Sequence, residues 1–325
     1  MTIQDHWYHR TWLSRLLLPV AYLFGAITAS RRALYRWGML HSFRAPVPVV
    51  VVGNISVGGT GKTPLVVYLA GVLAQSGYRV GVVSRGHGGS AAQAQEVSAQ
   101  SPVTIAGDEA LLIARNCDAR IWVGRQRSQA VAGLLEKHPC DVVLSDDGLQ
   151  HYALQRDVEI AVVDGARRMG NGWLLPAGPL RETPSRLRQA HMVVVNGDDV
   201  NAPYAFQLQI EQAVNLVDGE TRSLVSFRDT EVHAVAGIGH PARFFMQLQE
   251  LGLTCREHAF PDHHRFRAAD FAFADELPVL MTEKDAVKCA AFDDARLWYV
   301  PAALLDRESH IAEAVKRLLK ERAAH

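Results

Sequence analysis

Short apolar runs alternate with amphipathic stretches along most of this 325-residue chain. Val47 to Val52 is apolar throughout, with one proline, and apolar residues at helical spacing follow it from Leu65 to Leu73. Further short apolar runs occur at residues 79–84, 121–123, 142–144, 158–163 and 192–195. Strands that alternate with helices in this way predict a parallel sheet covered on both faces. We expect this α/β domain to occupy residues 46–203.

The pattern changes after this first domain. Between residues 205 and 227 the chain alternates in short strand-like segments, which predicts a β-ribbon that links two domains at 204–228. A new strand at Val232 and a helix from Pro241 begin a second, smaller α/β domain, expected at 229–325. An amphipathic helix from about Asp306 to Arg322 would close that domain.

Residues 1–45 differ from the rest of the chain. Their apolar stretch, 16–29, is too short for a comfortable bilayer span of about 20 residues. Tryptophans and tyrosines flank it, as in segments that lie at a membrane interface. Asp5 is the one acidic residue, against six arginines: Arg10, Arg15, Arg31, Arg32, Arg36 and Arg44. We expect membrane-associating helices here, although an ordinary core helix that caps the sheet remains an alternative.

A glycine-rich loop stands between the first strand and its helix. Strand, loop, Lys-Thr and helix form the context in which a P-loop motif predicts phosphate binding. Lys62 would lie along the β- and γ-phosphates, and the Thr63 hydroxyl would hold Mg²⁺. The sequence therefore predicts an ATP site with Mg²⁺ in a P-loop NTPase-type domain. The expected phosphate-binding residues are Ser56, Val57, Gly58, Gly59, Thr60, Gly61, Lys62 and Thr63.

A second metal-binding element follows the apolar run 142–144. Asp146 and Asp147 stand at the end of this predicted strand, where P-loop enzymes carry a carboxylate that reaches Mg²⁺. Adjacent residues of an extended strand point to opposite sides, so one of the two aspartates is expected to face the metal.

Composition narrows the function classes. The formal net charge is zero, which argues against nucleic acid as a partner. The four cysteines form no C-x-x-C pair, which fits free thiols in a reducing cytosol. A GTPase is disfavoured, because the lysine in residues 282–285 stands one position away from its place in a guanine-binding motif. A membrane-organising ATPase is also disfavoured, because Val57 stands where those enzymes carry a signature lysine. A kinase is favoured; a nucleotide-switched membrane adaptor remains the alternative.

The combined motifs resemble the tetraacyldisaccharide 4′-kinases of lipid A synthesis. The resemblance implies phosphorylation of the 4′-hydroxyl of a lipid A disaccharide 1-phosphate at the cytoplasmic face of the bacterial inner membrane, by a peripheral or monotopic enzyme. It also implies an active site in the cleft between two α/β domains. His87 departs from the pattern, which has Tyr there. The segments that carry the resemblance are Gly53–Pro64, Ser84–Gly86, Gly107–Glu109, Asp146–His151, Asn171–Glu182, Phe260–His264 and Thr282–Lys288.

Roles follow from this reading. We interpret Asp108, at the start of a predicted helix, as the base that accepts the 4′-hydroxyl proton, with His263 of the second domain as its partner. Arg181 is a candidate clamp on the transferred phosphate, because a guanidinium matches phosphate geometry. The expected metal ligands are Thr63, Glu109, Asp146 and Asp147, and the expected contacts to the disaccharide are Arg85 and His151.

Overall fold

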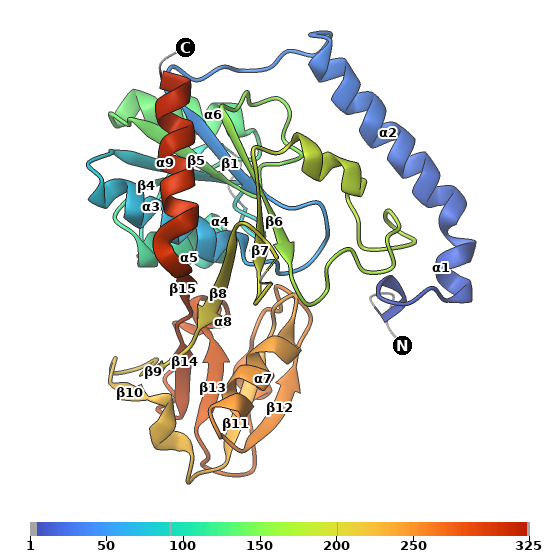
Figure 1. Ribbon diagram of the computed structural model, residues 1–325. Helices are drawn as coiled ribbons and strands as arrows, with labels where there is room; N and C mark the ends of the chain where they lie inside the picture. The colour runs from blue at the N-terminus through green and yellow to red at the C-terminus, as the bar shows by residue number, and fades with distance from the viewer. Residues whose placement is uncertain (1–4, 91–92, 200, 324–325) are drawn as a thin grey trace.

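Two β-sheets, each flanked by helices, organise the part of the chain that the computed structural model describes, residues 5–90, 93–199 and 201–323 (Figure 1). The elements up to β8 are η1 (Asp5–Trp7), α1 (Trp12–Leu16), α2 (Leu18–Arg36), β1 (Val49–Gly53), α3 (Lys62–Gln75), β2 (Val80–Ser84), β3 (Gln95–Val97), α4 (Val103–Ala106), α5 (Asp108–Asn116), β4 (Arg120–Val123), α6 (Arg127–Lys137), β5 (Val142–Asp146), β6 (Val158–Asp164), η2 (Pro184–Gln189), β7 (Met192–Asn196) and β8 (Ala205–Gln209). The remaining elements are β9 (Gln212–Asn215), β10 (Thr221–Ser223), η3 (Leu224–Phe227), β11 (Val232–Ala236), α7 (Pro241–Glu250), β12 (Cys255–Ala259), η4 (Ala268–Phe271), β13 (Val279–Thr282), α8 (Glu283–Cys289), β14 (Leu297–Val300), β15 (Ala303–Asp306), η5 (Arg307–Ser309) and α9 (His310–Ala323).

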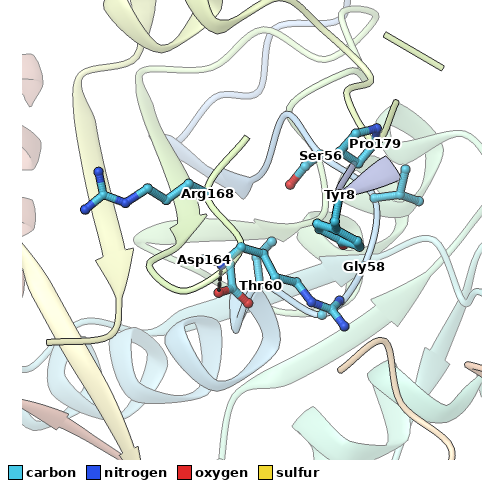
Figure 2. Close-up of a pocket in the computed structure, with 10 residues that line it drawn as sticks. Tyr8, Ser56, Gly58, Thr60, Asp164, Arg168 and Pro179 are labelled. Atoms are coloured by element: carbon cyan, nitrogen blue, oxygen red, sulfur yellow. Dashed lines mark hydrogen bonds between the residues drawn. The ribbon is translucent and has the colours of Figure 1, made fainter. Parts of the chain in front are cut away.

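The first sheet has the order β15-β8-β7-β6-β1-β5-β2-β4-β3. Its seven inner strands are parallel, and β15 and β3 pair antiparallel at the two edges. Parallel strands direct their carboxyl ends to one edge of the sheet, where ligands bind in such folds. The β1–β5 register places Val52 beside Asp146, so the loop after β1 and the end of β5 meet there. Figure 2 shows Ser56, after β1, and Asp164, at the end of β6, lining one pocket at this edge.

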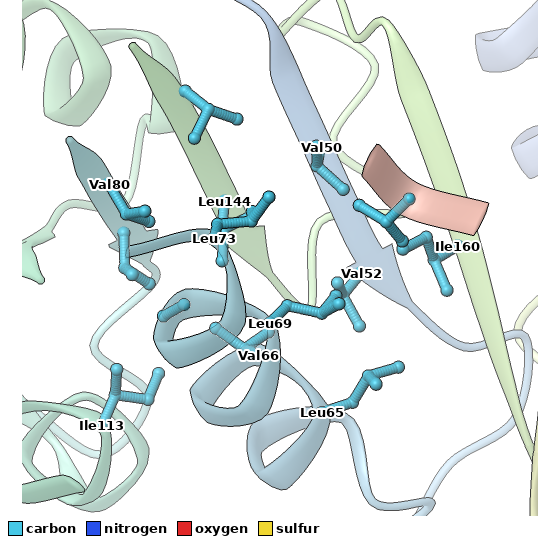
Figure 3. Close-up of a cluster of buried hydrophobic side chains, with 14 of the residues drawn as sticks. Val50, Val52, Leu65, Val66, Leu69, Leu73, Val80, Ile113, Leu144 and Ile160 are labelled. Carbon is cyan, nitrogen blue, oxygen red and sulfur yellow. The ribbon is translucent and has the colours of Figure 1, made fainter. Parts of the chain in front are cut away.

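Both faces of the central strand β1 are buried. Val50 and Val52 pack with Leu65 and Leu69 of α3 on one face (Figure 3). Val49 and Val51 pack on the other face with residues of α6. A strand buried on both sides explains the continuous apolar run in the sequence. A parallel sheet covered on both faces, the fold class that the apolar pattern predicts, is therefore observed.

The second sheet has the order β10-β9-β14-β13-β11-β12. Two chain segments connect it to the first sheet: β8 leads into β9, and β14 leads into β15. β14 pairs antiparallel with β9, and β15 pairs antiparallel with β8. The connection thus differs from a ribbon made by 204–228 alone, because its second strand comes from residues 297–306. Sequence alternation identifies strands but not the partner that each will find.

The C-terminal helix α9 returns to the first sheet. Its apolar residues Ile311, Ala314, Val315 and Leu319 are buried in the same core as α3 and β1. Figure 1 shows this helix beside the strands of the first sheet. The first sheet with its covering helices, α9 included, is called the first unit below, and the second sheet with its helices is called the second unit. The sequence predicts that residues 229–325 form the second domain. In the structure, however, the last helix of this range covers the first sheet. An amphipathic pattern predicts that a face is buried, but it does not say against which sheet.

The N-terminal helices lie along the outside of the first unit (Figure 1). Ala21 of α2 is buried, whereas many of the apolar side chains on α1 and α2 face solvent. The exposed apolar residues are Trp12, Leu16, Val20, Tyr22, Leu23 and Ile27. This arrangement disfavours the alternative of an ordinary core helix that caps the sheet. Among the described residues, no helix combines the length and apolarity needed to cross a membrane.

The contrast between buried and exposed leucines predicts a stability difference. Leu69→Ala removes a fully buried side chain of the first core and should lower the free energy of unfolding by about 2–5 kcal/mol. The same substitution at Leu23, which is 62% exposed, should change it by less than about 0.5 kcal/mol. Thermal melts of both variants measure this difference. Equal losses would contradict the assigned core.

Candidate active site

The loop between β1 and α3 has the backbone that a phosphate cradle requires. Gly58 and Gly61 have φ angles of 105° and 89°, which favour glycine. Gly61 precedes α3 and has no side chain to cap the first helical N–H groups, so these remain available to an anion. The amide of Val57 donates to the Pro179 carbonyl at 2.8 Å, which fixes the start of the loop.

A loop of the second unit rests on this cradle. A Cβ atom built on Gly59 would lie 3.8 Å from the Gly239 Cα. Arg167, in the loop after β6, donates to the Gly239 carbonyl at 2.5 Å. Arg243 of α7 donates to the buried Asp164 at 2.8 Å. The two units therefore meet directly beside the loop that is expected to bind phosphate.

Asp146 lies fully buried next to the start of α3. Its Oδ2 accepts a hydrogen bond from the Thr63 hydroxyl at 3.4 Å. Its Oδ1 has no hydrogen-bond partner within the described residues. Burial raises the pKa of Asp146 to about 7, and the neighbouring charges of Glu109 and Asp147 add to the rise. A buried carboxylate in this state would be stabilised by a cation.

Asp147 is bound to two cations rather than to Thr63. Arg181 donates to both carboxylate oxygens at 3.1 and 3.2 Å, and the Lys62 ammonium lies 3.5 Å from Oδ1. Burial alone would raise the pKa of Asp147, but Lys62 and Arg181 outweigh it and hold the pKa well below the ordinary value. The φ angle of Asp147 is 46°, so the two aspartates are not on one extended strand as the sequence suggested.

Asp108 and His263 meet across the two units. Asp108 begins α5, is buried, and its Oδ2 lies 2.8 Å from the His263 Nδ1. The hydrogen bond to Asp108 raises the pKa of His263. Burial would raise the pKa of Asp108, but the contacts with His263 and Lys284 outweigh it and lower the pKa. Both shifts favour the charged pair, in which an ionised Asp108 carboxylate accepts a hydrogen bond from the His263 imidazolium.

Lys284 of α8 links Glu109 to the same cluster. Its ammonium lies 3.2 Å from Glu109 Oε1, 3.5 Å from Asp262 Oδ1 and 3.9 Å from Asp108 Oδ2. Burial would lower the pKa of Lys284, but these carboxylates raise it above the ordinary value. Lys284 lies in a segment that carries the family resemblance, yet the sequence assigned it no role.

Arg127 is a further residue that sequence reasoning missed. It is 2% exposed and donates to the Asp146 carbonyl at 2.8 Å, so it fixes the turn between the two aspartates. Burial lowers its pKa to about 10. Its backbone N–H donates to His151 Nε2 at 3.2 Å. The sequence does contain a signal for Arg127, because it is the first residue of the helix that follows the parallel strand β4. That position lies at the edge of the sheet where ligands bind.

The two residues expected to contact the sugar lie near Arg127. Burial, together with the charge of Arg127, lowers the pKa of His151 to about 4, so this imidazole is neutral at physiological pH. Arg85 is exposed, and its charge contributes to the lowered pKa values of both Arg127 and His151. His87, which replaces the expected Tyr, has its ring 4.6 Å from the ring of His263.

The residues present fit Mg²⁺ and a triphosphate. Mg²⁺ prefers one or two carboxylates together with phosphate oxygens and water. The free Oδ1 of buried Asp146 and the hydroxyl of Thr63 supply such hard oxygen donors beside the P-loop. Within the described residues, no cluster of three or more His, Cys, Asp or Glu side chains is arranged to hold a metal ion.

Comparison with known proteins identifies the family. Residues 13–320 match the family described as Tetraacyldisaccharide-1-P 4′-kinase. The chain is 50% identical over 300 residues to the tetraacyldisaccharide 4′-kinase of Nitrosococcus oceani, which covers 92% of this chain and 89% of the relative. It is 47% identical over 333 residues to the enzyme of the same name from an Azoarcus species, across 100% of this chain and 96% of the relative.

A solved structure has the same fold. The "apo" form of LpxK from Aquifex aeolicus, crystallised in complex with ATP, superposes with a TM-score of 0.77. It is 30% identical in sequence, and the match covers 94% of this chain and 99% of that chain. Together with the P-loop, the paired aspartates and the match over residues 13–320, these similarities establish that the chain belongs to the tetraacyldisaccharide-1-P 4′-kinase family.

Proposed function

We propose that this kinase transfers the γ-phosphate of ATP to the 4′-hydroxyl of the tetraacyldisaccharide 1-phosphate, with Asp108 as the base. The observation that carries the proposal is the 2.8 Å contact between Asp108 and His263, across the two units. The acceptor hydroxyl must lose its proton to a base, and an ionised carboxylate can accept that proton. The lowered pKa of Asp108 keeps this carboxylate ionised at neutral pH.

The chain's own residues divide the remaining tasks. The N–H groups at the start of α3 and Lys62 bind the phosphates. Arg181 and Lys62 both contact the Asp147 carboxylate. When ATP is bound, these two cations would neutralise charge on its phosphates. His263 keeps Asp108 oriented through its Nδ1. Phosphoryl transfer depends mostly on such positioning and charge neutralisation.

The metal site proposed here uses Asp146 and Thr63, with Glu109 nearby. When bound, Mg²⁺ neutralises the charge on the phosphate oxygens. Asp147 is the weaker candidate ligand, because both its oxygens accept hydrogen bonds from Arg181. Arg85 and His151 remain candidates for contact with the disaccharide, since both lie near the turn that Arg127 holds.

The exposed apolar side chains of α1 and α2 support a membrane-facing role for the N-terminal helices. Apolar and arginine-rich amphipathic helices bind anionic lipid surfaces without crossing them. We propose that this face lies on the inner leaflet at the cytoplasmic side, where a lipid acceptor resides. The acyl chains of the acceptor would then reach the first unit along α2.

The family match does not favour the alternative function, a nucleotide-switched membrane adaptor. An adaptor that only hydrolyses its nucleotide needs no base for an acceptor hydroxyl. The Asp108–His263 pair, to which both units contribute, provides such a base. Transfer of labelled phosphate from ATP to the glycolipid acceptor, rather than to water, tests the kinase directly. Release of phosphate to water at the same rate, without a labelled glycolipid, would favour the adaptor.

Replacing the proposed base should abolish turnover and spare nucleotide binding. We expect Asp108→Asn to lower kcat about 100- to 10,000-fold, because the amide cannot accept the proton. Affinity for ATP, measured by calorimetry, should stay within about threefold, because the phosphate cradle is unaltered. A kcat within a few-fold of wild type would contradict the assignment.

Removal of the histidine should shift the pH profile. Burial raises the pKa of Asp108 and His263 is one of the groups that lower it, so the pKa of Asp108 should rise above its wild-type value when His263 is removed. The base must be ionised, so a higher pKa moves the acid limb of kcat/KM toward neutral pH. We expect His263→Ala to lose activity on acidification at a higher pH than wild type does. Rate profiles between about pH 5 and 9 measure this shift; an unmoved acid limb would argue against the pair.

The membrane-facing role predicts weaker lipid binding when the exposed face is made polar. We expect Leu23→Ser with Ile27→Ser to reduce association with vesicles of anionic phospholipid about tenfold or more, because apolar burial in the interface is lost. Val217→Ser, an exposed apolar site in the second unit, is the matched control. Co-sedimentation measures both, and an equal effect of the two changes would refute the assigned face.

A further inference from the structure

The N-terminal helix α2 forms an ion pair with Glu182, which lies in the segment between β6 and η2. Arg32 donates to Glu182 Oε2 at 3.1 Å, and Glu182 is 6% exposed. The same oxygen accepts from the Tyr152 hydroxyl at 2.6 Å. The rings of Tyr35, one turn after Arg32, and Tyr152 lie 6.2 Å apart. The C-terminal half of α2 is thus fixed to residues of the active-site loops.

A continuous series of contacts runs from Glu182 to the P-loop lysine. Gln150 donates to Glu182 Oε1 at 3.0 Å and to the Asn54 carbonyl at 2.9 Å, just before the P-loop. Arg181 donates to Gln150 Oε1 at 3.5 Å and to Asp147 Oδ2 at 3.1 Å. Asp147 in turn lies 3.5 Å from the Lys62 ammonium.

Backbone contacts make this series stiff. The amides of Arg181 and Glu182 both donate to the Ile55 carbonyl, at 2.7 and 3.4 Å. Ser56 and Leu180 form an antiparallel bridge beside them. A displacement of Glu182 would therefore be passed to the strand end that carries the P-loop as well as to Arg181. Glu182, at the start of this series, is buried with hydrogen bonds to both carboxylate oxygens, which limits its alternative arrangements.

We propose that Arg32 and Glu182 are positioning residues that couple the seating of α2 against the first unit to the placement of Arg181. The inference rests on the proposed function and adds a regulatory contact to it. Arg32 touches neither nucleotide nor acceptor in this scheme. It acts on Glu182, and through Gln150 on the arginine that faces the transferred phosphate. The enzyme would then turn over fully when α2 is seated against the first unit.

The test compares two arginines of the same helix. Arg32→Ala and Arg36→Ala remove the same charge, and Arg36 is exposed at the end of α2. Arg36→Ala reports the loss that membrane electrostatics alone cause. We expect Arg32→Ala to lower kcat about tenfold relative to Arg36→Ala, with KM for ATP unchanged between them. Arg32→Ala should lose no more vesicle association than Arg36→Ala, because the Arg32 guanidinium is paired with Glu182. Arg32→Lys, which keeps a charge opposite Glu182, should recover part of the kcat.

A double-mutant cycle tests the route. In the Gln150→Ala background, the further change Arg32→Ala should lower kcat less than about twofold, because the connection is already broken. Equal kcat values for Arg32→Ala and Arg36→Ala, or undiminished loss in the Gln150→Ala background, would overturn the proposal. Failure of the proposed function is separate, since it would appear as wild-type protein that labels no glycolipid.

Discussion

Concentration of negative charge at the ligand edge of the first sheet is the constraint on which this site depends. The sheet edge and the start of α5 bring four carboxylates together, and burial opposes the ionisation of three of them, Asp108, Asp146 and Asp147. Basic side chains from several elements surround them. The carboxylates are Asp108, Glu109, Asp146 and Asp147, and the surrounding basic residues are Lys62, Arg127, Arg181, His263 and Lys284. Asp146 is the member whose pKa is raised, and it is the one beside the P-loop hydroxyl.

The second unit contributes to this balance of charge. His263 and Lys284 both come from it, and both contact carboxylates of α5 in the first unit. The Gly239 loop lies on the P-loop from the same side. The two units are therefore held together by the groups that the reaction would use. A change in the charge of the bound nucleotide would alter the same contacts that keep the units closed.

Local motifs made much of the site predictable from the sequence. The Gly-rich loop and the two aspartates each follow an apolar run, and the Asp108–Glu109 pair begins a helix. The structure brings Thr63 to Asp146 and Asp108 to His263. Arg127 and Gln150 could not be assigned roles, because their importance lies in contacts to backbone carbonyls of distant segments. Likewise, amphipathicity identified α9 without naming the sheet that it covers.

The return of α9 to the first sheet has a consequence for biosynthesis. The first unit is completed by β15 and by a 14-residue helix that are the last described parts of the chain to be made. The second unit is in effect an insertion within the first, and its strands β11 to β13 form a continuous stretch of sequence. During translation the inserted unit can fold first, while the earlier-made sheet waits with an uncovered apolar face. Chaperone dependence or early aggregation should therefore follow truncation at the carboxyl terminus more than truncation within the insertion.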